Sequence, residues 1–221
     1  GIYATNSGTD LTINAATTTG ADYGIVAKNY GSGALSITTT GATTGGTGGD
    51  GIYALKRSTG DVTINAATTT GGNNGIRAKN KGTGALSITT TGTTTGDNDG
   101  IYADNDGTDL TINAATTTGG YNGIDAHNDG SGALSITTTG TTTGTKYDSI
   151  YANNSSAGTF LTINAATTIG GTGGIDARND GSGDLTINAA TTTGATVGID
   201  ARNRGTGALS MTTTGTTTGG G

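Results

Sequence analysis

Paired carboxylates are the side chains in this sequence best suited to acid–base chemistry. Asp176 and Asp200 occupy equivalent places in two consecutive repeats, so stacked repeats would hold them about 4.8 Å apart. Polysaccharide-cleaving enzymes use such pairs. However, Arg178 and Arg202 follow two residues later on the same face, and no long insertion forms a cleft. We therefore expect no enzyme, and a polysaccharide-binding or polysaccharide-cleaving protein is the less favoured alternative.

The single histidine is a second candidate for chemistry. His127 lies between Asp125 and Asp129, and Ser131 follows. Residues this close in sequence give no geometric support for a catalytic triad. We expect His127 to be a surface group whose pKa the neighbouring carboxylates raise.

Two stretches resemble calcium-binding sequences. Residues 45–53 (GGTGGDGIY) fit a calcium nonapeptide, but such sites need tandem copies and this chain has one. Residues 97–109 (DNDGIYADNDGTD) are rich in aspartate, but an EF-hand loop ends in a glutamate and the chain contains none. We expect no cofactor, with Ca²⁺ as the one ion that these stretches suggest.

These residues lie within a set of near-identical repeats. The repeats begin at residues 1, 24, 51, 75, 100, 123, 149, 174 and 198, and they are 23 to 27 residues long. That length is typical of units that stack into a solenoid. Apolar and polar residues alternate within each repeat, as in Ile2, Tyr3 and Ala4, which indicates strands with one buried face.

Stacking would align three apolar positions into ladders, from Ile2 to Ile199, from Leu11 to Leu209 and from Ile13 to Met211. One repeat cannot bury enough apolar surface to offset the entropy of ordering it, but stacked repeats share a continuous core. The sequence therefore predicts one all-β domain over residues 1–221. It would be a single-stranded parallel β-solenoid, a β-helix of nine coils and about 43 Å in length.

An asparagine recurs five residues after the start of eight repeats, and Lys56 replaces it in the other one. Its amide carries both a donor and an acceptor, so stacked copies can bond along the ladder. We expect a structural role for this asparagine ladder, which consists of Asn6, Asn29, Asn80, Asn105, Asn128, Asn154, Asn179 and Asn203.

The outward positions of the first strand vary from repeat to repeat, while the other positions barely change. Aromatic and charged side chains collect there, as a face that binds a partner would require, although solubility alone explains them equally well. The candidate interaction face comprises Tyr3, Tyr53, Arg77, Lys79, Lys81, Tyr102, Asp125, Tyr151, Asp176, Arg178, Asp200 and Arg202.

Composition narrows the classes of partner. The formal net charge of −6 disfavours nucleic acid and anionic membranes, and no apolar run is long enough to insert in a membrane. Without cysteine, neither disulfides nor cysteine-based zinc sites can form. Threonine-rich rows such as Thr12 and Thr38 also suggest an ice-binding solenoid, although Ser, Asn and Ala interrupt those rows.

The motifs GIYA, NDGSGALSITTTG and GTDLTINAATTTG resemble repeats in the passenger regions of bacterial autotransporters, the type V secreted proteins, and in related large surface adhesins. The resemblance implies a right-handed parallel β-helix displayed as a rod on the bacterial surface. We accordingly expect an extracellular stalk, fibre or matrix element, within a longer chain or a filament. Expected partners are further copies, end to end or side by side, or a host-surface or glycan ligand.

Overall fold

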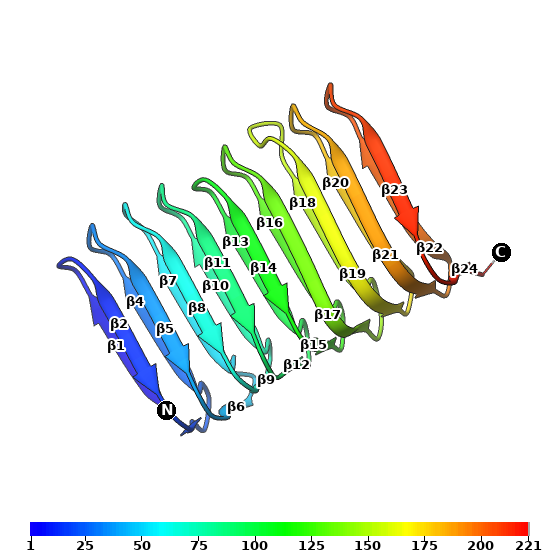
Figure 1. The fold of residues 1–221 in the computed structure, drawn as a ribbon. Coiled ribbons are helices and arrows are strands. Elements are labelled where there is room, and N and C mark those ends of the chain that lie inside the picture. The colour runs from blue at the N-terminus through cyan, green and yellow to red at the C-terminus, as the bar shows by residue number, and fades with distance from the viewer. Residues whose placement is uncertain (221) are drawn as a thin grey trace.

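The computed structural model describes residues 1–220, which wind into a β-solenoid with no helix among them. The coils stack along one axis, with the two chain ends at opposite ends of the stack (Figure 1). The predicted all-β parallel solenoid is confirmed, and its nine-stranded sheet receives one strand from each predicted coil.

One face of the solenoid is this nine-stranded sheet, which we call sheet A. All of its neighbouring strands run parallel. In order, its strands are β1 (Ile2–Asn6), β4 (Ile25–Asn29), β7 (Ile52–Lys56), β10 (Ile76–Asn80), β13 (Ile101–Asn105), β16 (Ile124–Asn128), β18 (Ile150–Asn154), β20 (Gly173–Asn179) and β22 (Val197–Asn203).

The remaining strands form a fifteen-stranded sheet, sheet B, that covers the other faces. Its L-x-I strands are β2 (Leu11–Ala15), β5 (Leu35–Thr39), β8 (Val62–Ala66), β11 (Leu86–Thr90), β14 (Leu110–Ala114) and β23 (Leu209–Thr213). Its threonine-rich strands are β3 (Thr18–Thr19), β6 (Thr43–Thr47), β9 (Thr69–Gly72), β12 (Thr93–Gly96), β15 (Thr116–Gly119) and β24 (Thr217–Gly219). In three coils the two kinds merge into the long strands β17 (Leu134–Gly144), β19 (Leu161–Gly170) and β21 (Leu185–Gly194).

The predicted apolar ladders form the core. Ile76 pairs with Ile101 on sheet A, and Leu86 pairs with Leu110 on sheet B. In the interior coils, the isoleucines and leucines of these ladders are completely buried. Because each coil covers the core of the next, no single repeat has to enclose a core of its own.

A column of inward-facing threonines completes the interior. It consists of Thr43, Thr69, Thr94, Thr117, Thr142, Thr168 and Thr192, all of which are buried. Their hydroxyl groups have no hydrogen-bond partner within the protein. Except for Thr168, their methyl groups pack toward the glycine that begins a coil, and a side chain added at Gly100 would clash with the Thr117 methyl group. Glycine at that position therefore lets the threonine-rich strand approach sheet A closely.

Candidate interaction face

The asparagine ladder has the predicted structural geometry. Asn80 donates a hydrogen bond to the Oδ1 of Asn105 at 2.8 Å, and Asn105 donates to Asn128 at 2.8 Å. Asn105 also donates to the Thr108 carbonyl, and its Oδ1 accepts from the Gly107 amide. Each side chain thus holds the turn of its own coil and bonds to the next coil, which requires a donor and an acceptor together.

All of these asparagines from Asn29 to Asn179 are fully buried, whereas Asn6 and Asn203 in the terminal coils are partly exposed. The bonds continue through Asn128 to Asn154 at 2.9 Å, Asn154 to Asn179 at 2.8 Å and Asn179 to Asn203 at 3.0 Å. No ligand could reach the buried members without unwinding a turn, so they belong to the scaffold.

The outward rows of sheet A bring the candidate residues into one face. Arg77 is the register partner of Tyr53 and Tyr102, and Lys79 is the partner of Asp104. Two apolar residues on this face, Val26 and Leu55, are nearly buried. Leu55 is the register partner of Lys28 and Lys79, so this apolar side chain lies between two long charged residues on the face.

Cations lie over tyrosine rings along the first half of this face. The Lys28 ammonium lies 5.1 Å from the centre of the Tyr3 ring and 5.9 Å from that of Tyr53. Arg77 lies 5.4 Å from the Tyr53 ring, and Lys79 lies 5.4 Å from the Tyr102 ring. Such contacts hold the cation above the face of the ring. They do not neutralise its charge, which can therefore attract a further partner.

The carboxylate pair from the last two coils is engaged by arginines. Asp176 and Asp200 are register partners, as predicted. Arg178 donates to Asp176 at 2.8 Å, and Arg202 donates to Asp200 at 2.6 Å. Each carboxylate is therefore bound to the arginine two residues along its own strand, which is the compensating arrangement that the sequence suggested.

His127 lies on the same face between two tyrosine rings. Its Nε2 is 2.9 Å from the Oδ1 of Asp125, and its ring centre lies 6.1 Å from that of Tyr102 and 5.4 Å from that of Tyr151. The hydrogen bond with Asp125 raises the pKa of His127, and this outweighs the opposite effect of burial. Asp125 and Tyr151 also line an open hollow of about 350 Å³ that reaches Tyr147.

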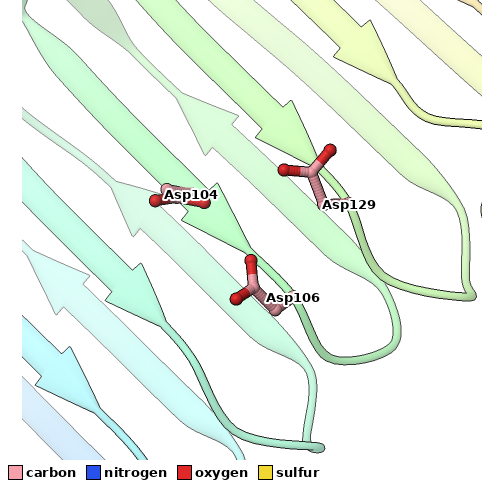
Figure 2. Close-up of side chains that lie close together, drawn as sticks. All are labelled: Asp104, Asp106 and Asp129. Carbon is pink, nitrogen blue, oxygen red and sulfur yellow. The ribbon is translucent and has the colours of Figure 1, made fainter.

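Three carboxylates gather where β13 and β16 end. One oxygen from each of Asp104, Asp106 and Asp129 lies within 4.8 Å of the others, the arrangement shown in Figure 2. The Lys81 ammonium already lies 2.8 Å from Asp104 and 2.9 Å from Asp106. Burial of the ammonium acts to lower the pKa of Lys81, but the hydrogen bonds and charges of these two aspartates together outweigh it, so the pKa is raised. The cluster is the one group of three metal-ligating side chains among residues 1–220, and one lysine balances only part of its charge.

Several carboxylates of the two calcium-like stretches accept hydrogen bonds from the following coil. Within residues 97–109, Asp99 accepts a hydrogen bond from the Asn122 amide, and Asp109 accepts one from the Ala133 amide. Asp99 and Asp109 therefore lie apart from the cluster that Asp104 and Asp106 of the same stretch form with Asp129. In residues 45–53, the buried Asp50 uses its Oδ1 to accept hydrogen bonds from both the backbone and the side chain of Asn74.

The structure reveals a second polar ladder that the sequence analysis missed. It runs along the corner before sheet A and alternates aspartate with asparagine: Asp50, Asn74, Asp99, Asn122 and Asp148. The backbone amide of each residue from Asn74 onward donates to the side chain one coil earlier. The alternation places an uncharged amide between successive carboxylates, so like charges stand about 9.6 Å apart.

A related contact joins four pairs of successive repeats. Asp10, Asp61, Asp109 and Asp184 accept hydrogen bonds from the backbone amides of Ala34, Ala85, Ala133 and Ala208 at 2.7 to 2.9 Å. Each aspartate binds the following coil, which carries alanine at the equivalent place. The sequence shows an aspartate before the L-x-I strand alternating with an alanine at the same place. The pattern alone did not indicate that the aspartate accepts a hydrogen bond from the alanine amide.

Comparison with known proteins adds no further assignment. No helix among residues 1–220 is long and apolar enough to cross a membrane. No protein family, no curated protein and no solved structure matches this chain.

Proposed function

We propose that this chain is a rigid structural element of a bacterial cell surface: a stalk, fibre or matrix component that holds other elements away from the cell. The observation that carries the proposal is the unbroken strand register of sheet A. From Ile2 to Ile199, every coil aligns its first isoleucine with the isoleucine of the next coil. Nothing inserted between coils interrupts the axis.

The interior supports a mechanical role. Backbone hydrogen bonds, the asparagine ladder and the aspartate–asparagine ladder all run from coil to coil along the axis. Such axial networks resist separation and bending of the coils, which is the property that a stalk needs. The proposed location outside a bacterial cell rests on the resemblance of the repeat motifs to autotransporter passengers.

Two measurements test this proposal. Small-angle X-ray scattering of the purified chain is expected to fit the profile calculated for nine stacked coils, which extend about 43 Å along the axis. Antibodies against the chain are expected to label intact producing cells as strongly as permeabilised ones. A scattering profile typical of a flexible chain would remove the mechanical role, and labelling that required permeabilisation would contradict the surface location.

Ice binding is the alternative to be separated from this role. The outward Thr and Ser row of sheet B gives a repetitive hydroxyl surface, with pairs such as Thr12 and Ser36 in register. However, an open hollow of about 300 Å³, lined by residues that include Asn164, Ala166 and Thr214, interrupts the sheet in the last coils. Absence of thermal hysteresis at millimolar protein would exclude this alternative, whereas hysteresis with faceted ice crystals would replace the structural proposal.

A further inference from the structure

Charge is segregated along the rod in a way that the fold does not require. Residues 24–96 contain six lysines and arginines and two aspartates, whereas residues 97–145 contain seven aspartates and no lysine or arginine. The boundary falls between β10 and β13, near the middle of sheet A. A soluble rod would gain the same solubility from interspersed charges, so the separation suggests a complementary partner.

Charges on both sides of the boundary lack full compensation within the chain. Arg57, Arg77 and Lys79 make no ion pair with any residue from 1 to 220, and each instead lies about 5 to 6 Å from a tyrosine ring. On the other side, the cluster of Asp104, Asp106 and Asp129 has three carboxylates for one contacting lysine (Figure 2). The surplus cations and the surplus carboxylates are on the same face.

A second copy of this chain is a partner whose charges can match this pattern. A two-fold axis that lies in the plane of contact, parallel to the strands and between β10 and β13, would bring two sheet A faces together with antiparallel rod axes. We number the coils from 1 to 9 in the order of their sheet A strands. Coil 4 (β10) of one copy would then face coil 5 (β13) of the other, and coil 3 (β7) would face coil 6 (β16). Residues keep their place along the strand under this operation, because the axis is parallel to the strands.

The row just beyond the strand ends changes sign about that axis. In coils 3 to 6 it reads Arg57, Lys81, Asp106 and Asp129. The axis therefore places Lys81 against Asp106 of the second copy, and Arg57 against Asp129 of the second copy. A two-fold axis along the rod would instead place each coil against itself, with cation facing cation and carboxylate facing carboxylate.

We propose that this chain forms an antiparallel dimer through the charged face of sheet A, with its two-fold axis between β10 and β13. Eight coils overlap in this arrangement, which gives an interface of roughly 1,300 Å² in total, at the lower end of stable interfaces. The dimer is accordingly weak and salt-sensitive, since its specificity comes from exposed charges. It goes beyond the structural role above, because a stalk requires no lateral partner.

Charge reversal at one proposed contact provides the first test. Arg57 and Asp129 are both exposed, so the variants Arg57→Asp and Asp129→Arg leave the core intact. In sedimentation equilibrium at low ionic strength, each single variant is expected to weaken dimerisation about tenfold or more. The double variant restores opposite charges across the interface and is expected to recover dimerisation to within about threefold.

A matched control separates this contact from net charge. Arg204 lies in the same row, in the last coil, outside the proposed overlap. Arg204→Asp changes the net charge as Arg57→Asp does and is expected to leave dimerisation unchanged. Circular dichroism of every variant would confirm that the solenoid is folded.

Disulfide trapping tests the orientation directly, since the chain contains no cysteine. The axis places position 30 against position 155 of the second copy. Mixing Tyr30→Cys with Ser155→Cys is therefore expected to give a crosslinked dimer, whereas Tyr30→Cys alone is not. A monomer at every salt concentration, equal effects of Arg57→Asp and Arg204→Asp, or crosslinking of Tyr30→Cys with itself would each overturn the proposal. A rod-shaped monomer would leave the structural role standing.

Discussion

Asn29 and Lys56 are register partners on β4 and β7, and the asparagine ladder is interrupted between them. Lys56 is completely buried, and its ammonium group donates a hydrogen bond to the carbonyl of Gly31. A lysine has no acceptor, so it cannot hold its own turn as the asparagines do. That turn instead passes through Gly60, whose φ of +98° is one that residues with side chains rarely adopt.

Replacing this lysine is expected to stabilise the protein. Lys56→Asn would complete the ladder between Asn29 and Asn80, and it would remove an amine that is costly to bury. We expect the free energy of unfolding to rise by about 1–3 kcal/mol. Urea unfolding, together with hydrogen exchange of the amides in coils 2 to 4, measures the change.

The pH dependence of that variant provides a further check. Burial lowers the pKa of Lys56 below its ordinary value, so the unfolded chain holds the proton more readily than the folded one. The stability of the native protein should therefore rise as the pH increases toward about 10.4, and this rise should be absent in Lys56→Asn. Lys28→Asn, a change at a partly exposed lysine, serves as the control, and equal stabilisation by both variants would contradict the role given to burial.

Breaking the asparagine ladder at its centre is expected to be costly. Asn105→Ala removes the acceptor of Asn80 and the donor to Asn128, both of them buried. We expect a loss of roughly 2–4 kcal/mol, seen as a lower urea midpoint. Asn164→Ala removes a more exposed amide pair with Asn188 and should cost less than about 0.5 kcal/mol. Similar losses for the two variants would show that burial of the ladder is unimportant.

The interior threonine column offers a stabilising substitution. The Oγ1 of Thr117 is buried without a partner in the protein, while its methyl group packs toward Gly100. Thr117→Val keeps the shape and removes the hydroxyl, so we expect stability to be unchanged or to rise by about 1 kcal/mol. Thr117→Ser, which keeps the hydroxyl and loses the methyl group, should be destabilising. Thermal unfolding of both distinguishes the cases, and a destabilised valine variant would mean that the hydroxyl is hydrogen-bonded after all.

Mild acid is expected to stabilise the solenoid. The pKa of His127 is raised mainly by its hydrogen bond with Asp125, so its contribution is complete below about pH 6.5 and is lost as the pH rises through the raised value. Burial raises the pKa values of Asp99 and Asp148, so the folded state gains stability as the pH falls through those values. Melting temperature should therefore increase from pH 8 to pH 5.

Two variants show which residue causes each part of this dependence of melting temperature on pH. His127→Gln is expected to remove the change near neutral pH and to leave the acidic part, whereas Asp148→Asn should reduce the acidic part alone. A melting temperature that falls steadily between pH 8 and pH 5 would show that these groups do not control stability.

The repeating part of the fold was predictable because each of its causes is visible within one repeat. The alternation of Ile2 with Tyr3 identifies a buried face, and the recurrence of the same letters identifies what stacks on what. The asparagine ladder was predictable for the same reason, since identical amides at one strand spacing can bond to one another.

Contacts between unlike residues of successive coils were not predictable in this way. The bond from the Ala133 amide to Asp109 and the ladder that contains Asp99 and Asn122 depend on how the turns approach each other. The inward direction of Thr117 also escaped prediction, because threonine in a polar tail is expected to face solvent. Such features require the path of the backbone at each corner, which a repeat pattern does not specify.

The one-to-one register of sheet A has a consequence for how such a gene can change. Because each coil presents the same interior to both neighbours, a duplication or deletion of a two-coil unit would leave every remaining contact in place. The rod would lengthen or shorten by about 9.6 Å at each event. Recombination between near-identical repeats can therefore change the length of this protein in fixed steps, and the protein encoded after each step would still fold.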